Sequence, residues 1–160
     1  MRTSQTIQGV EVFRRDGKMS ALSNVSGVSQ LKDWFGYIPN FHDAEVVGLD
    51  LRRGADPSTL HVHTWRTSSE VDQNGNFRRD RHATVSFVFS NIVELEVRDW
   101  NYQNVLARMD ITKNDEGHTI MLTGSFGVDG RIVANLIGIG VEPRVVDLSR
   151  GLDEQQGEGK

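Results

Sequence analysis

The fold is decided by residues 47–65, VGLDLRRGADPSTLHVHTW, in which apolar and polar side chains alternate on both sides of a turn. Apolar residues occupy positions 47, 49 and 51, and positions 60, 62 and 64 then alternate with two histidines and a tryptophan. Side chains two apart on a strand point to the same face, so the pattern is typical of two half-buried strands. The turn at Asp56-Pro57-Ser58 predicts that these strands are antiparallel.

Similar alternation continues toward the carboxyl end, in residues 85–97, 105–111, 120–126 and 132–141. The first of these runs is long, and we expect a bend or bulge in it at Ser90-Asn91. Each run predicts a further strand of the same sheet.

Two connections between these strands have distinct compositions. Residues 68–80 are polar and contain Asn74-Gly75-Asn76, which predicts an exposed loop. Asp129-Gly130 lies between two apolar runs, and a dipeptide of this kind is the strongest short-range signal of a β-hairpin.

A helix is predicted upstream of the sheet. In residues 28–35 the apolar side chains recur at helical spacing. Ser26 or Ser29 is expected to cap the amino end, and Gly36 suits the position just after the carboxyl end.

These elements predict an α+β fold that is mostly β: a single antiparallel meander sheet of six to seven strands, forming a curved sheet or open barrel, with one short N-terminal helix. An apolar run at residues 10–15, closed by Asp16-Gly17, would supply a first strand. We expect one domain over residues 1–148 and a disordered tail over residues 149–160, which lack periodicity.

Composition excludes several classes of protein. The 160 residues are 37% hydrophobic and 25% charged, without an apolar run of the ~20 residues that a membrane span needs. With no cysteine, disulfides and thiol chemistry are excluded. The net charge of −4 disfavours nucleic acid as a partner. We expect a soluble cytoplasmic protein without a secretory signal or a cofactor.

His61 and His63 form the first candidate site, because side chains at i and i+2 of a strand share a face and could reach one metal ion. A zinc or iron site needs a third protein ligand, for which His82 is the candidate. The alternative is that the two histidines are solvated or paired across strands, and we favour this alternative over a metal site.

The segment His42-Asp43, followed by Glu45, is the second candidate. Asp43 and Glu45 would face the same way on a strand and could act as an acid/base pair. We favour a structural role, in which His42 and Asp43 satisfy buried backbone groups where the chain leaves the helix and enters the sheet. Phe41 is then expected to pack with Trp34 or Phe35.

Nucleophilic catalysis has no support in the sequence, because the serines at positions 86, 90 and 125 lack the Gly-x-Ser-x-Gly context. The basic cluster Arg78-Arg79-Asp80-Arg81-His82 would suit an anion or an acidic protein. A solvated loop end is the simpler interpretation, since Asp80 dilutes the positive charge.

The segment Phe41-His42-Asp43-Ala44-Glu45-Val46 carries a resemblance to a known family, together with Trp34 upstream and Gly127-Val128-Asp129-Gly130 near the carboxyl end. Over roughly residues 28–142 the chain resembles the bacterial immunity protein 50 family. The resemblance implies a small β-rich fold and a protein that neutralises a toxin of a polymorphic toxin system by binding it.

We therefore expect a non-enzymatic binding protein with a protein partner. A homodimer that forms through an edge strand is compatible with this expectation. The tentative binding surface consists of acidic residues that would complement a cationic toxin. These are Asp43, Glu45, Asp50, Glu94 and Glu96. The alternative function is a metal- or small-ligand-binding β protein or enzyme that uses His61 and His63.

Overall fold

Six antiparallel strands and one helix make up most of residues 21–145, the part of the chain that the computed structural model describes. The elements are α2 (Val28–Phe35), β1 (Glu45–Asp50), β2 (Ser58–Val71), β3 (Phe77–Arg98), β4 (Val105–Asn114), β5 (Gly117–Phe126) and β6 (Asp129–Pro143). The mostly-β fold with a short helix is thus confirmed. The strand expected at residues 10–15 and the tail expected at 149–160 lie outside the described residues.

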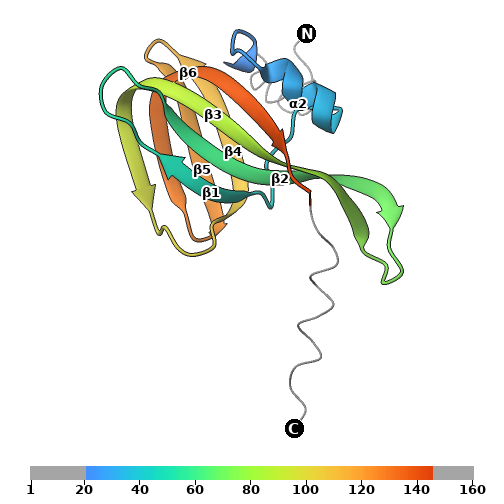
Figure 1. The fold of residues 1–160 in the computed structure, drawn as a ribbon. Helices are drawn as coiled ribbons and strands as arrows, with labels where there is room; N and C mark the ends of the chain where they lie inside the picture. Colours follow the sequence, from blue (N-terminus) through green and yellow to red (C-terminus); the bar gives the residue numbers. More distant parts are fainter. Residues whose placement is uncertain (1–20, 146–160) are drawn as a thin grey trace, which may run out of the picture.

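The sheet closes on itself (Figure 1). Its strand order is β1-β2-β3-β6-β5-β4, and β1 also pairs with β4 through Glu45 and Val105. At this seam the Val46 N–H donates to the Asn104 carbonyl and the Leu106 N–H to the Ala44 carbonyl, each at 2.8 Å. The order differs from one uninterrupted meander, because the long strand β3 pairs along its length with β6 and not with β4.

Bulges shift which residues face the core. In β1 the pairing register shifts between Val46 and Gly48, so Val46 is buried while Val47 is 46% exposed. The expectation that Val47 faces the core is therefore wrong, since one extra residue in a strand reverses the alternation. Leu51, expected on the same buried face, lies beyond the end of β1 and is 47% exposed. The bend expected at Ser90-Asn91 is confirmed: the register of β3 shifts after Ser90, and Asn91 has a φ of 50°.

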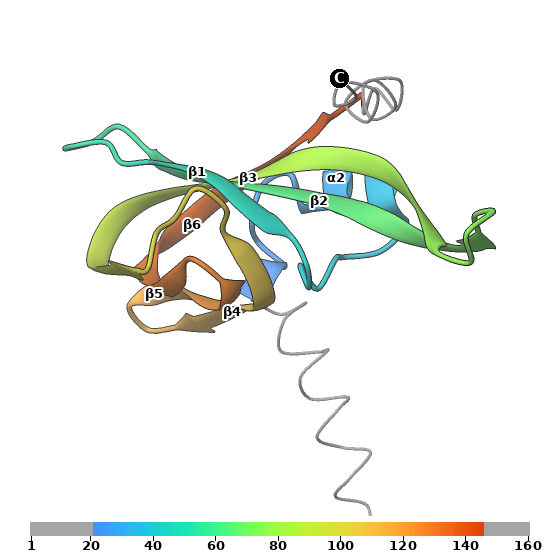
Figure 2. The ribbon, with the colours of Figure 1, turned by 90° about the horizontal axis from the view of Figure 1, so that it is seen from below.

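Residues 68–80 are exposed, but they are not a loop. Strands β2 and β3 run on to Val71 and Phe77, which pair with each other, and residues 72–76 connect them. We call residues 64–82 the arm, and Figure 2 shows it extending beyond the ring of strands. The Asp72 carboxylate accepts hydrogen bonds from the backbone N–H groups of Asn74 and Asn76, which holds the turn closed.

The helix α2 lies beside β6 (Figure 1) and buries Leu31 and Phe35. Gly36 follows it with a φ of 83° and donates its N–H to the Lys32 carbonyl at 2.8 Å, as predicted. The predicted serine caps are wrong. The N-cap residue is Gly27, because the chain there lies too close to the backbone of Ile139 for a side chain.

The hairpin between β5 and β6 is confirmed, although its turn lies earlier than expected. Gly127, with a φ of 75°, lies in the turn, whereas Asp129 and Gly130 already belong to β6. A side chain at position 130 would overlap the Glu96 carbonyl oxygen, so this glycine permits close strand approach.

The core fills the inside of the ring and the space beneath α2. Its large, fully buried side chains include Phe35, Phe41, Phe87 and Phe89. Phe41 stacks edge-to-face on Phe87 with a centroid distance of 5.4 Å, where the sequence suggested Trp34 or Phe35 as its neighbour. Within residues 21–145 we find no helix long and apolar enough to cross a membrane.

Candidate binding cleft

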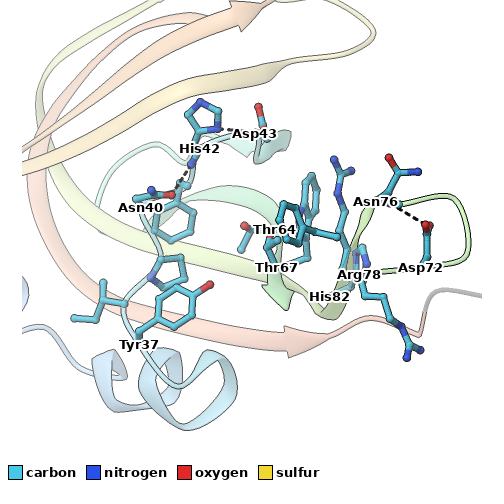
Figure 3. Close-up of a pocket in the computed structure, with 17 residues that line it drawn as sticks. Tyr37, Asn40, His42, Asp43, Thr64, Thr67, Asp72, Asn76, Arg78 and His82 are labelled. Carbon is cyan, nitrogen blue, oxygen red and sulfur yellow. Dashed lines mark hydrogen bonds and ion pairs between the residues drawn. The ribbon is translucent and has the colours of Figure 1, made fainter. Parts of the chain in front are cut away.

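A cleft of about 1210 Å³ lies between the arm and the connection from α2 to β1 (Figure 3). Residues 37–43 form one wall, and strands β2 and β3 of the arm form the other. The lining includes Tyr37, Trp65, Phe77, Arg79 and His82. Aromatic rings and arginines are the side chains that dominate the energetics of protein interfaces.

Backbone hydrogen bonds and the buried Phe41 side chain fix the conformation of the wall formed by residues 37–43. Phe41 and Asp43 both adopt left-handed conformations, with φ values of 60° and 61°, and Phe41 anchors the segment in the core. The Asn40 side-chain oxygen accepts from the His42 N–H at 3.0 Å, and the Asp43 N–H donates to the Leu106 carbonyl at 2.9 Å.

These contacts correct the role expected for His42 and Asp43. Both side chains are more than half exposed, and His42 Nδ1 lies 3.2 Å from the Asp43 carboxylate. The carboxylate therefore does not serve buried backbone donors. The junction remains a structural element, but the side-chain partner for its backbone is Asn40.

Where the arm joins the ring of strands, the rings of His63, Trp65 and His82 form a cluster. His63 Nε2 lies 3.1 Å from His82 Nδ1, and the Trp65 ring is within 5.7 Å of both imidazoles, centroid to centroid. The Arg79 guanidinium lies over the Trp65 ring at 4.5 Å from its centroid, in cation–π contact.

The histidines of this cluster favour the neutral state. Burial, followed by the charges of Arg144 and His82, lowers the pKa of His63 to about 4. Burial, followed by the charges of Arg79 and Arg144, also lowers the pKa of His82. The hydrogen bond between the rings requires one to donate and the other to accept, and two neutral imidazoles meet this requirement.

We predict that the free energy of unfolding decreases as the pH is lowered from about 6.5 toward about 4. In that window a histidine of the unfolded chain, with the ordinary pKa of 6.5, binds a proton that folded His63 does not bind. Protonation therefore favours the unfolded state. Asp72 and Asp80, whose pKa values are lowered from 3.8, act below this window.

Urea unfolding at several pH values between about 4 and 7.5 tests this prediction. Replacing both His63 and His82 by Gln should flatten the dependence. An equally steep dependence in the double variant would contradict the assignment to this pair.

His61 lies apart from this pair. It shares the partly exposed face of β2 with His63, as predicted, but its Nδ1 contacts Ser86 Oγ at 3.0 Å across the strand pair. Residues 21–145 contain no group of three or more His, Asp or Glu side chains placed to bind a metal ion. The three histidines of the metal hypothesis therefore do not converge.

The five acidic residues of the predicted binding surface are not gathered on one strand pair. Asp43, Glu45 and Asp50 lie in or beside β1, while Glu94 and Glu96 lie in β3, which is not a neighbour of β1 in the sheet. Three of them form ion pairs with arginine. These pairs are Asp50–Arg52, Glu94–Arg131 and Glu96–Arg98.

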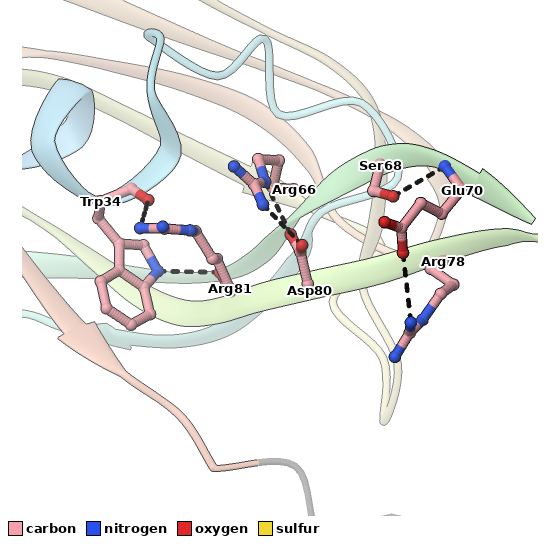
Figure 4. A network of polar contacts seen from close by, with 7 residues as sticks. All are labelled: Trp34, Arg66, Ser68, Glu70, Arg78, Asp80 and Arg81. Atoms are coloured by element: carbon pink, nitrogen blue, oxygen red, sulfur yellow. Dashed lines mark hydrogen bonds and ion pairs between the residues drawn. The ribbon is translucent and has the colours of Figure 1, made fainter.

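The basic cluster at residues 78–82 is ordered, as Figure 4 shows. Asp80 accepts two hydrogen bonds from Arg66, Arg78 pairs with Glu70 at 3.3 Å, and Arg81 exchanges hydrogen bonds with Trp34. The segment belongs to strand β3 and is not a loop end, although most of its side chains are exposed as expected. Within residues 21–145, Arg79 has no carboxylate at ion-pairing distance.

Sequence reasoning missed most of the cleft. It singled out His42, Asp43 and the basic cluster, but it did not place them opposite each other, and it assigned no role to Tyr37 or Trp65. The signal available was that Trp65 follows His61 and His63 on the same strand face, with three arginines at positions 78, 79 and 81 further along the chain.

Comparison with known proteins gives one match. The family model described as "Immunity protein 50" matches residues 27–143. This range includes both walls of the cleft and the whole sheet. No curated protein and no solved structure matches the chain.

Proposed function

Since the chain belongs to the immunity protein 50 family, we propose that it neutralises a bacterial toxin by binding it, without performing chemistry itself. The toxin is a protein, and the encounter takes place in the cytoplasm of the bacterium that makes both. The cleft between residues 37–43 and the arm is the binding surface in this proposal.

The observation that carries the proposal is the composition of the cleft. Tyr37, Trp65 and Arg79 all line it, and these residue types are enriched among those that contribute most to protein–protein affinity. The lining extends from residues 37–43 to the turn of the arm at Asp72 and Asn76 (Figure 3), which suits a protein segment.

The surroundings of the Ser86–His61 pair favour a binding role over nucleophilic catalysis. Ser86 and His61 form the one serine–histidine contact that we describe, and it is a cross-strand pair on the outer face of the sheet. A nucleophilic serine also needs a group that orients the histidine and donors that stabilise an oxyanion. The hydrogen bonds of His61 within residues 21–145 include no such orienting group.

We expect co-expression with the toxin encoded beside this gene to restore growth, and the two purified proteins to elute together in gel filtration. A toxin variant without activity should still bind, because neutralisation by occlusion does not require toxin turnover. Failure both to restore growth and to form a complex would contradict the proposed function.

A further inference from the structure

We propose that the cleft receives an extended, acidic segment of the partner protein, which pairs as an additional strand with the free edge of β2 at residues 64–71. This inference rests on the proposed function, the partner being the toxin. It specifies the chemistry of the surface that the toxin presents: backbone groups in extended conformation, with carboxylate side chains.

The edge of β2 is open where it lines the cleft. Strand β1 pairs with β2 only as far as the Glu45–His63 pair. Within the described part of the chain, residues 64–71 pair with β3 on one side and with no strand on the other. Unpaired backbone N–H and C=O groups of an edge strand are a template for strand addition by another chain.

The opposite edge of the arm, along β3, is covered at its base, at Arg81 and His82. Trp34 donates its indole N–H to the Arg81 carbonyl at 2.9 Å, and the Arg144 N–H donates to the His82 carbonyl at 2.8 Å. The Arg81 guanidinium in turn donates to the Trp34 carbonyl at 2.9 Å (Figure 4). Residues 77–80 of β3 also have no strand on their outer side within the described residues. The β2 edge is the one that continues from the pairing with β1, which residues 37–43 precede, so it lies beside the other wall of the cleft.

The arm is held in position before any partner binds. Arg66 and Asp80 form a two-fold hydrogen-bonded ion pair across β2 and β3, at 2.7 and 2.8 Å, and Arg78 reaches Glu70. Together with the Asp72 turn, these contacts fix the twist of a strand pair that has no sheet around it. A preformed edge loses less conformational freedom on binding.

Charge selects the segment. The carboxylates of the cleft and arm already have partners: Asp43 faces His42, Glu70 and Asp80 face arginines, and Asp72 holds the turn. Arg79 has its Trp65 ring contact and no carboxylate partner within residues 21–145. A cationic segment would thus find no unpaired acid among these groups, while an acidic one finds Arg79.

The lowered pKa values of His82 and Asp80 agree with a preference for an acidic segment. The charges of Arg79 and Arg144 contribute to lowering the pKa of His82, and Arg66, Arg81 and Arg78 contribute to lowering the pKa of Asp80. The charges of Arg79 and Arg144 act on His82 against that of Asp80, so cationic groups outnumber anionic ones around this ring, as an acidic segment requires.

A peptide titration tests the inference without the toxin. The probe is a blocked peptide of about eight alternating Glu and Thr residues, the length of residues 64–71 at ~3.3 Å per residue, added to the isotope-labelled full chain. We expect amide shifts and slowed hydrogen exchange within residues 64–71, with shifts in residues 37–43. A matched peptide with Gln in place of Glu should bind about tenfold more weakly.

Three variants locate the charge recognition. Arg79→Gln should weaken binding of the Glu peptide about tenfold, Arg79→Lys should retain most of it, and Arg108→Gln should leave it unchanged. Arg108 is an exposed arginine on β4, so the last variant removes the same charge away from the cleft. Equal binding of the two peptides, or protection along β3 instead of β2, would overturn the inference.

The toxin complex separates this inference from the proposed function. If the wild-type protein restores growth and Arg79→Gln binds the toxin as tightly as Arg108→Gln does, the function stands and the acidic segment is wrong. If the wild-type protein fails with the toxin, the function is wrong, and the peptide result still decides what the edge of β2 binds. Protection of residues 64–71 that rises with protein concentration alone would show a second copy on this edge, and would also overturn the inference.

Discussion

Replacing Gly27 with Ala is expected to lower the free energy of unfolding by about 3 kcal/mol, as two separate costs add. Gly27 has a φ of 85°, a conformation in which any L-residue with a Cβ is strained. In addition, the new Cβ would overlap the carbonyl oxygen of Ile139 in β6. The backbone at Gly27 would have to move away from Ile139. This movement would strain the neighbouring hydrogen bond, in which the Ser26 carbonyl accepts the Ile139 N–H at 2.8 Å.

Gly36 provides a matched control for this prediction. It has nearly the same φ, 83°, at the other end of the same helix, but a Cβ at that position would meet no atom within 4 Å. Gly36→Ala should therefore show the conformational cost alone, about 1 kcal/mol. Urea unfolding followed by tryptophan fluorescence measures both variants. Equal losses would mean that the contact with β6 adds nothing, contrary to our expectation.

Asn104→Ala is expected to cost about 3 kcal/mol, because the Asn104 side chain is buried and makes three hydrogen bonds. Its oxygen accepts the N–H groups of Val128 at 3.0 Å and Asn101 at 2.9 Å, and its amide group donates to the Asn101 carbonyl at 2.9 Å. Alanine would leave the buried Val128 N–H without an acceptor, in addition to opening a small cavity.

Asn114→Ala is the comparison for Asn104→Ala. The Asn114 oxygen also accepts a backbone N–H, that of Glu116 at 3.0 Å, but in an exposed turn where water can replace it. We expect a loss below about 1 kcal/mol. Thermal unfolding of both variants provides the measurement. A loss at Asn104 no larger than that at Asn114 would show that the buried bonds contribute little.

Much of the fold follows from local patterns in the sequence. The spacing of apolar residues in 28–35 and the glycine at position 36 are sufficient for helix α2, because both act within one turn of chain. Alternation likewise predicts most strands. The bulge in β1 has no comparable signal: Val46 and Val47 are both valine, and pairing with β2 decides which of them is buried.

The arm shows a different limit of prediction. Apart from the exposed Val71 and Phe77, residues 68–80 are polar, because a strand pair with solvent on both faces has no apolar side to mark it. Its order depends on cross-strand pairs such as Arg66–Asp80, which are 14 residues apart in the chain. The cleft was unpredictable for the same reason, since one wall precedes β1 and the other lies beyond it in the sequence.

The candidate residues differ in how far the sequence could assign them. The shared face of His61 and His63 follows from strand geometry and is confirmed. The pairing of His63 with His82 requires the register of β2 on β3, which alternation leaves open. Buried polar residues such as Asn104 and His118 were missed, since only the tertiary structure shows their partners.

The seam between β1 and β4 has a consequence for the dynamics of the molecule. It consists of one paired residue couple and a few flanking backbone bonds, whereas β3 and β6 are paired over 13 couples. Local opening follows the weakest junction, so transient fluctuations should separate β1 from β4 before any other pair of strands. The same bonds, including Asp43 N–H to Leu106, hold one wall of the cleft. A ligand that binds only when this wall is in place therefore reduces transient opening between β1 and β4, although that seam lies outside the surface that the ligand contacts.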